Sequence, residues 1–423
     1  MPIAASILAV LTFGFTLSHF QRTSLSPIAP DLMVELHLSP DAFGLIASGI
    51  FLGVAVGQIP TGILLDRFGT RRVTPLVLLL AVAGSLWFAA ADTVWALFAS
   101  RFLIGLGIAS TLMGTLVVAA RWFPPDRFAT VSAVVFAIAG GFGNGLGTAP
   151  MAAAADLVGW RWAFVGSAGV VALAAVLIAI VVRDVPPGHP FWNRHPESVR
   201  RSLAGVVEVA KLPGMGRILV MAMMGYPALM TILGGWGGPY LADVHGLGPV
   251  ARGNVLAAIV VGNVLGFVIV GPLDRWLDTR KGIVLGGSSL CAATLGLLAL
   301  WPHPPLAIVV ALLVLFGAAT SFSVTNIALG RALVPERLMG RGVTMVNFAT
   351  FVGNALLQLM AGPLIGLFVA SGPAPEIAYR FVFGSLAVMF ILAILVFRRV
   401  ADRPPSAERR VSALRAAPMA TID

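Results

Sequence analysis

His19, Arg22 and Ser26 are the residues of this sequence whose types and spacing best suit the binding of a charged molecule. They are three and seven residues apart, so a continuous α-helix would present them on one face. A guanidinium held in low-dielectric surroundings attracts a carboxylate or phosphate and can bind it with two hydrogen bonds. We therefore expect these three residues to contact a small anion. The alternative is an Arg22 that binds helix carbonyls or extends toward the membrane surface.

A second group of candidates is uncharged. Asn347, Phe351, Asn354 and Gln358 follow helical spacing and would form a polar stripe on an otherwise apolar helix. Polar residues in such helices either bind one helix to another or line a cavity, and the pattern leaves both roles open. The candidates for substrate contact in this group are Asn144, Tyr226, Asn347 and Asn354.

The elements that must position these side chains are membrane helices. Of the 423 residues, 58% are hydrophobic and 11% are charged, whereas soluble proteins carry about 25% charged residues. The chain contains about twelve apolar stretches of the length, about 20 residues, that a bilayer-spanning helix needs. Twelve spans leave no room for a soluble catalytic domain, so we expect neither an enzyme nor a cofactor. A Walker loop, a CxxC pair and a Ser/His/Asp set at a plausible spacing are all absent from the sequence.

The spans are predicted from the hydropathy pattern. They cover residues 4–33, 41–65, 73–91, 94–119, 128–152, 162–182, 217–242, 251–273, 282–301, 305–331, 341–369 and 379–399. This predicts an all-α membrane protein with a six-helix bundle at 1–182, a linker at 183–216, a second bundle at 217–400 and a tail at 401–423.

The net charge of +10 is explained by topology rather than by nucleic-acid binding. All but five of the 28 Lys and Arg fall on one side of the twelve-span arrangement; the five are Arg22, Arg101, Arg161, Arg252 and Arg380. The positive-inside rule then places both termini, the linker and the tail in the cytoplasm, as in a protein of the inner membrane. Residues 1–20 lack the basic start and small-residue cleavage site of a signal peptide, so we expect a retained first helix.

The segment Gly62-Ile-Leu-Leu-Asp66-Arg67-Phe-Gly69-Thr-Arg71-Arg72 lies between two apolar stretches and returns in degraded form as Gly271-Pro-Leu-Asp274-Arg275. At this repeated motif the chain resembles the major facilitator superfamily of twelve-helix secondary transporters. The resemblance implies two parallel six-helix repeats, with substrate held between them near the middle of the bilayer.

The resemblance also implies a gating role for the motif. Asp66 can cap a neighbouring helix N-terminus or pair with an Arg across the seam between the repeats. In the family such pairs hold the cytoplasmic side shut. We expect a gating set of Gly62, Asp66, Arg67, Gly69, Arg71, Arg72 and Asp274. The alternative is that these residues only set topology and stability, with Arg71 and Arg72 as simple anchors at the membrane surface.

Two further segments carry the resemblance. Phe20-Gln-Arg22-Thr-Ser-Leu-Ser-Pro-Ile-Ala-Pro30 resembles the first helix of organic-anion transporters of the superfamily, where a mid-helix Arg contacts the anion. Arg101-Phe-Leu-Ile-Gly105-Leu-Gly107 resembles the fourth-helix motif, whose Arg is linked to proton coupling or to bonding with the first helix. For Arg101 we favour the second role. The chain is most similar to the nitrate and organic-anion side of the superfamily.

The sequence therefore predicts a monomeric secondary transporter that carries a small organic or inorganic anion into the cell by rocker-switch alternating access, coupled to protons. Because no Asp or Glu lies near a predicted helix centre, the proton would travel on His19 or on the substrate. Metal is not expected, since methionines such as Met221 and Met224 are common gap-fillers. The alternatives are an exporter of amphiphilic compounds and a transport-inactive receptor or assembly factor with a transporter fold.

Overall fold

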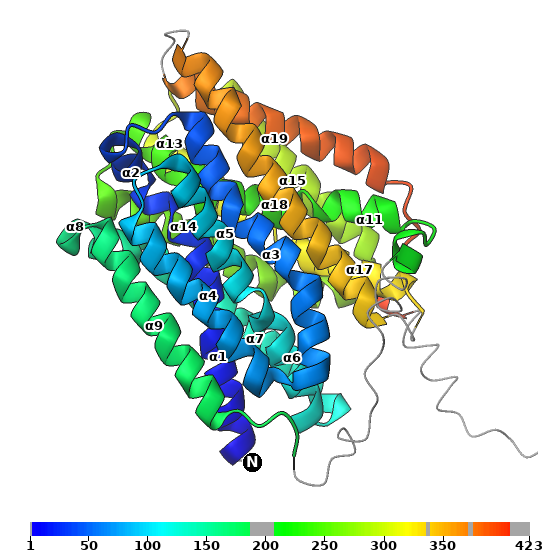
Figure 1. Cartoon of the computed structure of the whole chain (residues 1–423). Helices are drawn as coiled ribbons and strands as arrows, with labels where there is room; N and C mark the ends of the chain where they lie inside the picture. The colour runs from blue at the N-terminus through cyan, green and yellow to red at the C-terminus, as the bar shows by residue number, and fades with distance from the viewer. Residues whose placement is uncertain (1, 187–206, 336–338, 371–374, 407–423) are drawn as a thin grey trace, which may run out of the picture.

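The computed structural model describes residues 2–186, 207–335, 339–370 and 375–406 (Figure 1). This part of the chain is helical and contains no strand. Twelve of its helical stretches are long and apolar enough to cross a membrane, from Ile3–Glu35 to Pro375–Phe397. The predicted number of spans is therefore confirmed. The two predicted bundles are present, while the predicted boundaries of the linker and the tail fall partly outside the described residues and stay a prediction.

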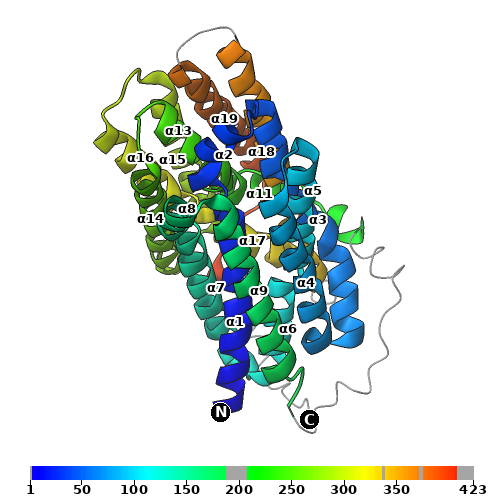
Figure 2. The same ribbon diagram turned by 60° about the vertical axis from the view of Figure 1, so that its left-hand side comes forward.

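The first bundle consists of α1 (Pro2–Thr23), η1 (Ser26–Ile28), α2 (Ala29–Glu35), α3 (Pro40–Phe68), α4 (Thr70–Ala90), α5 (Val94–Ile108), α6 (Ser110–Trp122), α7 (Pro125–Leu146), α8 (Ala149–Val158) and α9 (Trp160–Val181). The second consists of α11 (Met215–Ala222), α12 (Gly225–Thr231), η3 (Ile232–Trp236), α13 (Gly237–Asp243), α14 (Pro249–Trp276), α15 (Arg280–Leu300), α16 (Leu306–Ala319), α17 (Phe322–Leu333), α18 (Met339–Ala370) and α19 (Pro375–Phe397). Helix α1 lies between α7 and α9, as Figure 2 shows.

Several spans are broken where proline prevents the helix from continuing. The ring of a proline clashes with the carbonyl four residues earlier and supplies no N–H. Helix α1 ends at Thr23, four residues before Pro27, and α7 ends at Leu146, four residues before Pro150. The expectation that His19, Arg22 and Ser26 share one face of a continuous helix was therefore wrong, because Ser26 lies beyond the break, in η1.

The two bundles pack tightly against each other at one end of the molecule, which we call the α2 end. In both views it lies opposite the start of α1 and contains α2 and α13 (Figures 1 and 2). There Gly44 of α3 meets α18: a Cβ on Gly44 would lie 2.8 Å from the Gln358 carbonyl oxygen and 3.1 Å from the Gly362 Cα. Glycine is required at this crossing because any side chain would separate the backbones.

The opposite end of α3, near the start of α1, makes a different kind of surface. A Cβ on Gly62 would meet no described atom within 4 Å. Asp66, Arg67 and Phe68 are exposed to solvent there. Helix α3 is therefore packed against the second bundle through its first turns, while its last turns stand away from it. The seam between the bundles is closed at the α2 end.

Candidate functional site

Arg22 lies at the end of α1, beside the seam between the two bundles. Only 5% of the residue is exposed. Its guanidinium donates a long hydrogen bond of 3.5 Å to Ser18 Oγ and lies 5.0 Å from the ring centroid of Phe351 in α18. Its Nε is buried with no partner, and no carboxylate pairs with Arg22 among the described residues. A buried cation without a counter-charge is costly, so Arg22 is suited to receive an anion.

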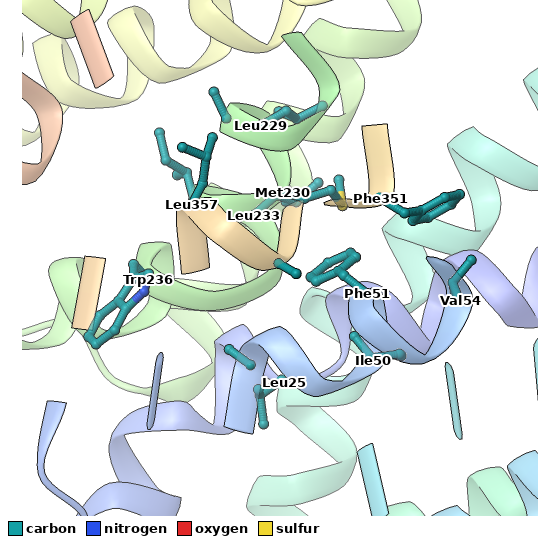
Figure 3. Close-up of a cluster of buried hydrophobic side chains, with 14 of the residues drawn as sticks. Leu25, Ile50, Phe51, Val54, Leu229, Met230, Leu233, Trp236, Phe351 and Leu357 are labelled. Carbon is teal, nitrogen blue, oxygen red and sulfur yellow. The ribbon is translucent and has the colours of Figure 1, made fainter. Parts of the chain in front are cut away.

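An apolar cluster that includes Phe351, the ring beside Arg22, lies in the seam. Figure 3 shows side chains from both bundles gathered there, Leu25 and Phe51 from the first and Met230, Trp236 and Leu357 from the second. All of them are buried in the core. Such a layer excludes water, which strengthens any electrostatic contact made by the Arg22 guanidinium beside it.

The polar stripe of α18 is buried and faces the other helices of the seam. Phe351 contacts Arg22, and Asn354 and Gln358 are fully buried. Asn354 Nδ2 donates to the Thr350 carbonyl over 2.9 Å, and Gln358 Nε2 donates to the Met230 carbonyl over 3.1 Å. The side-chain oxygens of Asn354 and Gln358 have no described partner. These oxygens can accept hydrogen bonds from the hydroxyl groups of a ligand when the helices move apart. Asn347 is half-buried on the same helix.

Tyr226 of α12 and Ser26 of η1 occupy different places. The Tyr226 hydroxyl is buried and has no described partner, so it remains available to a ligand. Ser26 instead joins the two bundles at the α2 end. Its Oγ accepts from the Gly238 N–H over 3.0 Å and lies 3.5 Å from the Ile232 carbonyl oxygen. The structure therefore separates Ser26 from Arg22 and gives it a part in closing the seam.

His19 and Asn144, two separate candidates from the sequence, are brought together by the fold. His19 Nδ1 lies 3.3 Å from Asn144 Oδ1, while His19 Nε2 is buried without a described partner. Two glycines allow this approach: a Cβ on Gly143 of α7 would lie 2.6 Å from the His19 Cβ, and one on Gly147, directly after α7, would lie 2.8 Å from the Phe20 carbonyl oxygen. His19 lies about one turn before Arg22 on α1, so its imidazole is in the electrostatic field of the Arg22 guanidinium.

Arg101 has a different environment from Arg22. Its guanidinium is fully buried in the first bundle and donates through one Nη to the carbonyl of Gln21 over 3.0 Å. Gln21 belongs to the last turn of α1, where carbonyls lack helical partners and the helix dipole is negative. Arg101 thus caps the broken end of α1, which agrees with the bonding role favoured from the sequence.

Gln21 itself was not singled out by the sequence. Its Nε2 donates to Ser85 Oγ over 3.2 Å and approaches Ser167 Oγ at 3.5 Å. It therefore ties α1 to α4 and α9 beside Arg22. The one signal in the sequence that could have identified Gln21 is its place directly before Arg22 in an apolar stretch.

The gating set lies at the end of the molecule opposite α2. Asp66, Arg67, Arg71 and Arg72 are exposed. Gly69 has a φ of 79°, which any residue with a side chain would adopt at a cost.

The N-terminus of α4, the helix after this loop, is capped by a residue that the sequence analysis had not named. Asp184 Oδ1 accepts from the Thr70 N–H over 2.5 Å and from the Arg71 N–H over 3.1 Å. Arg71 Nε also donates to the Ala179 carbonyl over 3.0 Å. Arg71 therefore contacts the end of α9, in addition to any role as a surface anchor.

The second bundle repeats this arrangement. Asp402 Oδ1 accepts from the Lys281 N–H over 3.0 Å, and Thr279 Oγ1 donates to Asp402 Oδ2 over 2.5 Å, so Asp402 caps α15 as Asp184 caps α4. Asp278, two residues before α15, has a positive φ of 46°. Asp274 lies 3.8 Å from Arg280 Nε. The repeat thus continues beyond Asp274 through the segment that begins α15.

Comparison with known proteins agrees with this architecture. A sequence model of the Major Facilitator Superfamily matches residues 11–358. The chain is 31% identical to a probable galactarate/D-glucarate transporter of Bacillus subtilis over 196 residues, which is 44% of this chain and 42% of that protein. It is 24% identical to a putative tartrate transporter of Agrobacterium vitis over 274 residues, 60% of this chain and 62% of that protein. These alignments span less than two thirds of each relative.

Solved structures share the fold over nearly the whole chain. A bacterial homolog of the human lysosomal transporter Spinster, inward-facing and unoccupied, has a TM-score of 0.74 at 17% identity, covering 95% of this chain and 98% of that one. The inward-open xylose transporter of Escherichia coli has a TM-score of 0.74 at 16% identity, covering 97% and 99%. At these identities the likeness speaks for the fold only. The helical arrangement and the family match together show that this multi-pass membrane protein belongs to the major facilitator superfamily.

Proposed function

We propose that this transporter carries a small organic anion across the membrane by rocker-switch alternating access, with Arg22 as the residue that binds the negative charge. The observation that carries the proposal is the buried guanidinium of Arg22, which has one long hydrogen bond and no paired carboxylate among the described residues. Arg22 lies at the seam, where a movement of one bundle against the other changes its surroundings. A bound carboxylate would supply the missing counter-charge.

The substrate class is narrowed by the polar atoms near the seam. Tyr226 Oη and the amide oxygens of Asn354 and Gln358 have no described partner and can accept hydrogen bonds. Hydroxyl groups donate such bonds, so a hydroxylated carboxylate suits both the cation and the acceptors. The relatives named for galactarate, D-glucarate and tartrate point the same way. These three acids are the first substrates to test.

The proposed orientation puts the α2 end outside and both termini in the cytoplasm of an inner-membrane protein, acting as a monomer. Three arginines lie at the α2 end, and each has a carboxylate partner: Arg161 with Glu35 and Asp92, Arg252 with Asp31, and Arg380 with Glu376. Pairing cancels their charge on this side, which supports the positive-inside assignment. Import then requires the α2 end to open, accept the anion beside Arg22, and close again.

Protons are the coupling ion that we propose. Among the Asp and Glu residues whose burial the structure describes, Glu376 is the one that is buried, and it lies near the α2 end. A proton that accompanies the anion would therefore travel on the substrate or on His19, whose Nε2 has no described partner. Uptake into proteoliposomes driven by an inward proton gradient tests this point, and uptake unaffected by a protonophore would contradict it.

Ligand affinity of Arg22 variants tests the anion site. Arg22→Gln should lose roughly ten- to a hundred-fold in affinity, because a charged hydrogen bond is worth about 1.5–3 kcal/mol. Arg22→Lys keeps the charge but loses the two-pronged geometry, so its loss should be smaller. Affinity for tartrate, galactarate and D-glucarate is measured by calorimetry on the purified, monodisperse protein.

Arg161→Gln is the matched control, because Arg161 is also an arginine of the first bundle but is paired at the α2 end. It should bind these acids as the unaltered protein does. Equal affinity of Arg22→Gln and the unaltered protein for a transported acid would overturn the assignment.

A further inference from the structure

Arg252 is a second buried arginine that crosses the seam, and the sequence analysis gave it no role. It lies in the first turn of α14, in the second bundle, with 5% of its side chain exposed. One of its Nη atoms donates to Asp31 Oδ2 in α2 over 2.8 Å and to the Pro27 carbonyl in η1 over 3.0 Å. Both acceptors belong to the first bundle. The contact therefore links the second bundle to the segment that follows the break in α1.

The backbones around Arg252 are in close contact across the same seam. A Cβ on Gly253, the next residue, would lie 2.8 Å from the Ala149 Cα of α8. Such an approach holds the guanidinium against η1 and α2 only while the α2 end is closed. When the bundles separate there, Arg252 must give up both acceptors.

The cost of that separation falls mainly on Arg252. Its side chain is buried, whereas that of Asp31 is 52% exposed, so only the arginine depends on the pair for compensation. Its Nε already lacks a described partner. Opening the α2 end breaks both hydrogen bonds of this charged group, and a charge-assisted hydrogen bond stabilises the state in which it is made. The pair therefore stabilises the state in which the α2 end is closed.

We propose that the Arg252–Asp31 pair is a latch that sets how often the α2 end of this transporter opens. The proposal rests on the alternating access of the proposed function, but not on the identity of the substrate. Arg252 acts on transport through the position of η1 and α2, which continue from the turn that carries Arg22. It is a positioning residue and does not touch the anion.

The chain supplies a matched control at the same end of the molecule. Arg161 of α9 pairs with Glu35 of α2 and with Asp92, whose Oδ1 lies 2.6 Å from an Nη atom. All three residues belong to the first bundle, so this network moves with it. Breaking the Arg161–Asp92 contact removes a similar surface charge pair without releasing the seam.

Reaction of a cysteine at position 26 reports opening of the α2 end. Ser26 is fully buried in the closed seam, and the native Cys291 is also buried, so Ser26→Cys provides one reporter with little background. The rate of reaction with a hydrophilic maleimide is measured in nanodiscs without substrate, where both faces are accessible. In this background Asp31→Asn should react roughly two- to ten-fold faster, given the range for half-exposed and buried charged pairs.

The control variants distinguish specific opening of the α2 end from a general loss of stability of the protein. Asp31→Asn leaves Arg252 in the electrostatic field of Asp243, which belongs to the same bundle, so the fold should persist. Arg252→Gln should accelerate the reaction as Asp31→Asn does, and combining the two should add little more. Asp92→Asn should leave the rate unchanged. Equal rates for Asp31→Asn and its parent, or equal acceleration by Asp92→Asn, would overturn the latch and leave the anion site untouched.

Discussion

At the scale of single residues, the two buried arginines of the first bundle differ in the hydrogen bond that each donates. Arg101 donates to the Gln21 carbonyl at the negative end of α1, so its charge has a favourable dipole beside it. The Arg22 guanidinium instead lies over the Phe351 ring and donates one long hydrogen bond to Ser18 Oγ. A cation kept in such surroundings reduces the stability of the empty protein, and this is the expected character of a site that waits for an anion.

Arg22→Gln should therefore raise the thermal unfolding midpoint of the substrate-free protein while it weakens substrate binding. Replacing an uncompensated buried charge by a neutral side chain stabilises by about 1 kcal/mol or more. Midpoints are measured in detergent with and without the identified acid. Added acid should stabilise the unaltered protein and leave Arg22→Gln unchanged. A lower midpoint for the substrate-free variant would mean that Arg22 is a structural residue.

At the scale of elements, the glycines of α7 decide how closely α1 can approach. Gly143 faces the backbone of α1 at His19, whereas a Cβ on Gly140, one turn earlier, would meet no described atom within 4 Å. Both lie in the same helix, so they experience the same helix propensity but different packing. The His19–Asn144 contact depends on the first and not on the second.

Gly143→Ala should destabilise the protein by about 1–3 kcal/mol, because the added methyl group forces α1 and α7 apart. Gly140→Ala should be neutral or stabilising by up to about 1 kcal/mol, since alanine is the better helix former. Chemical denaturation of each variant in mild detergent gives the comparison. If both variants were equally stable, the close packing of α1 on α7 would be contradicted.

At the scale of the whole molecule, α3 connects the closed and the exposed parts of the seam. Its start packs on α18 at Gly362, and its last turn carries the exposed Asp66 and Arg67. Rocking that opens the α2 end would bring this last turn toward the second bundle. We propose that the gating residues predicted from the sequence act when the α2 end is open.

Asp66→Asn should slow transport several-fold while ligand affinity stays within about two-fold. The reason is that a gating Asp66 acts on the conformational step and not on the binding site. Counterflow in proteoliposomes and calorimetry on the same preparation separate the two quantities. Asp184→Ala is the comparison: it removes the cap on α4 and should cost about 0.5–2 kcal/mol of stability. Transport by Asp66→Asn at the unaltered rate would remove the support for gating.

The sequence by itself was enough to predict the twelve spans, the two bundles and the family, because these depend on features that are local in the chain. A run of apolar residues must be helical to cross a bilayer, since its backbone groups have no other partners there. The breaks near Pro27 and Pro150 also follow from local physics, but the sequence analysis missed them and expected a continuous helix through Ser26. Arg22 was identified because a charged residue in an apolar run is costly wherever its neighbours lie.

Only the tertiary structure decided which of the candidate residues act together. It joined Arg22 to Phe351 and His19 to Asn144, and it moved Ser26 to the closed seam. It assigned the cap on α4 to Asp184, far along the chain. The seam pair of Arg252 and Asp31 was invisible to spacing, because 221 residues separate its members. Such contacts depend on how the two bundles are packed, and a helical pattern constrains only residues within a few turns of one another.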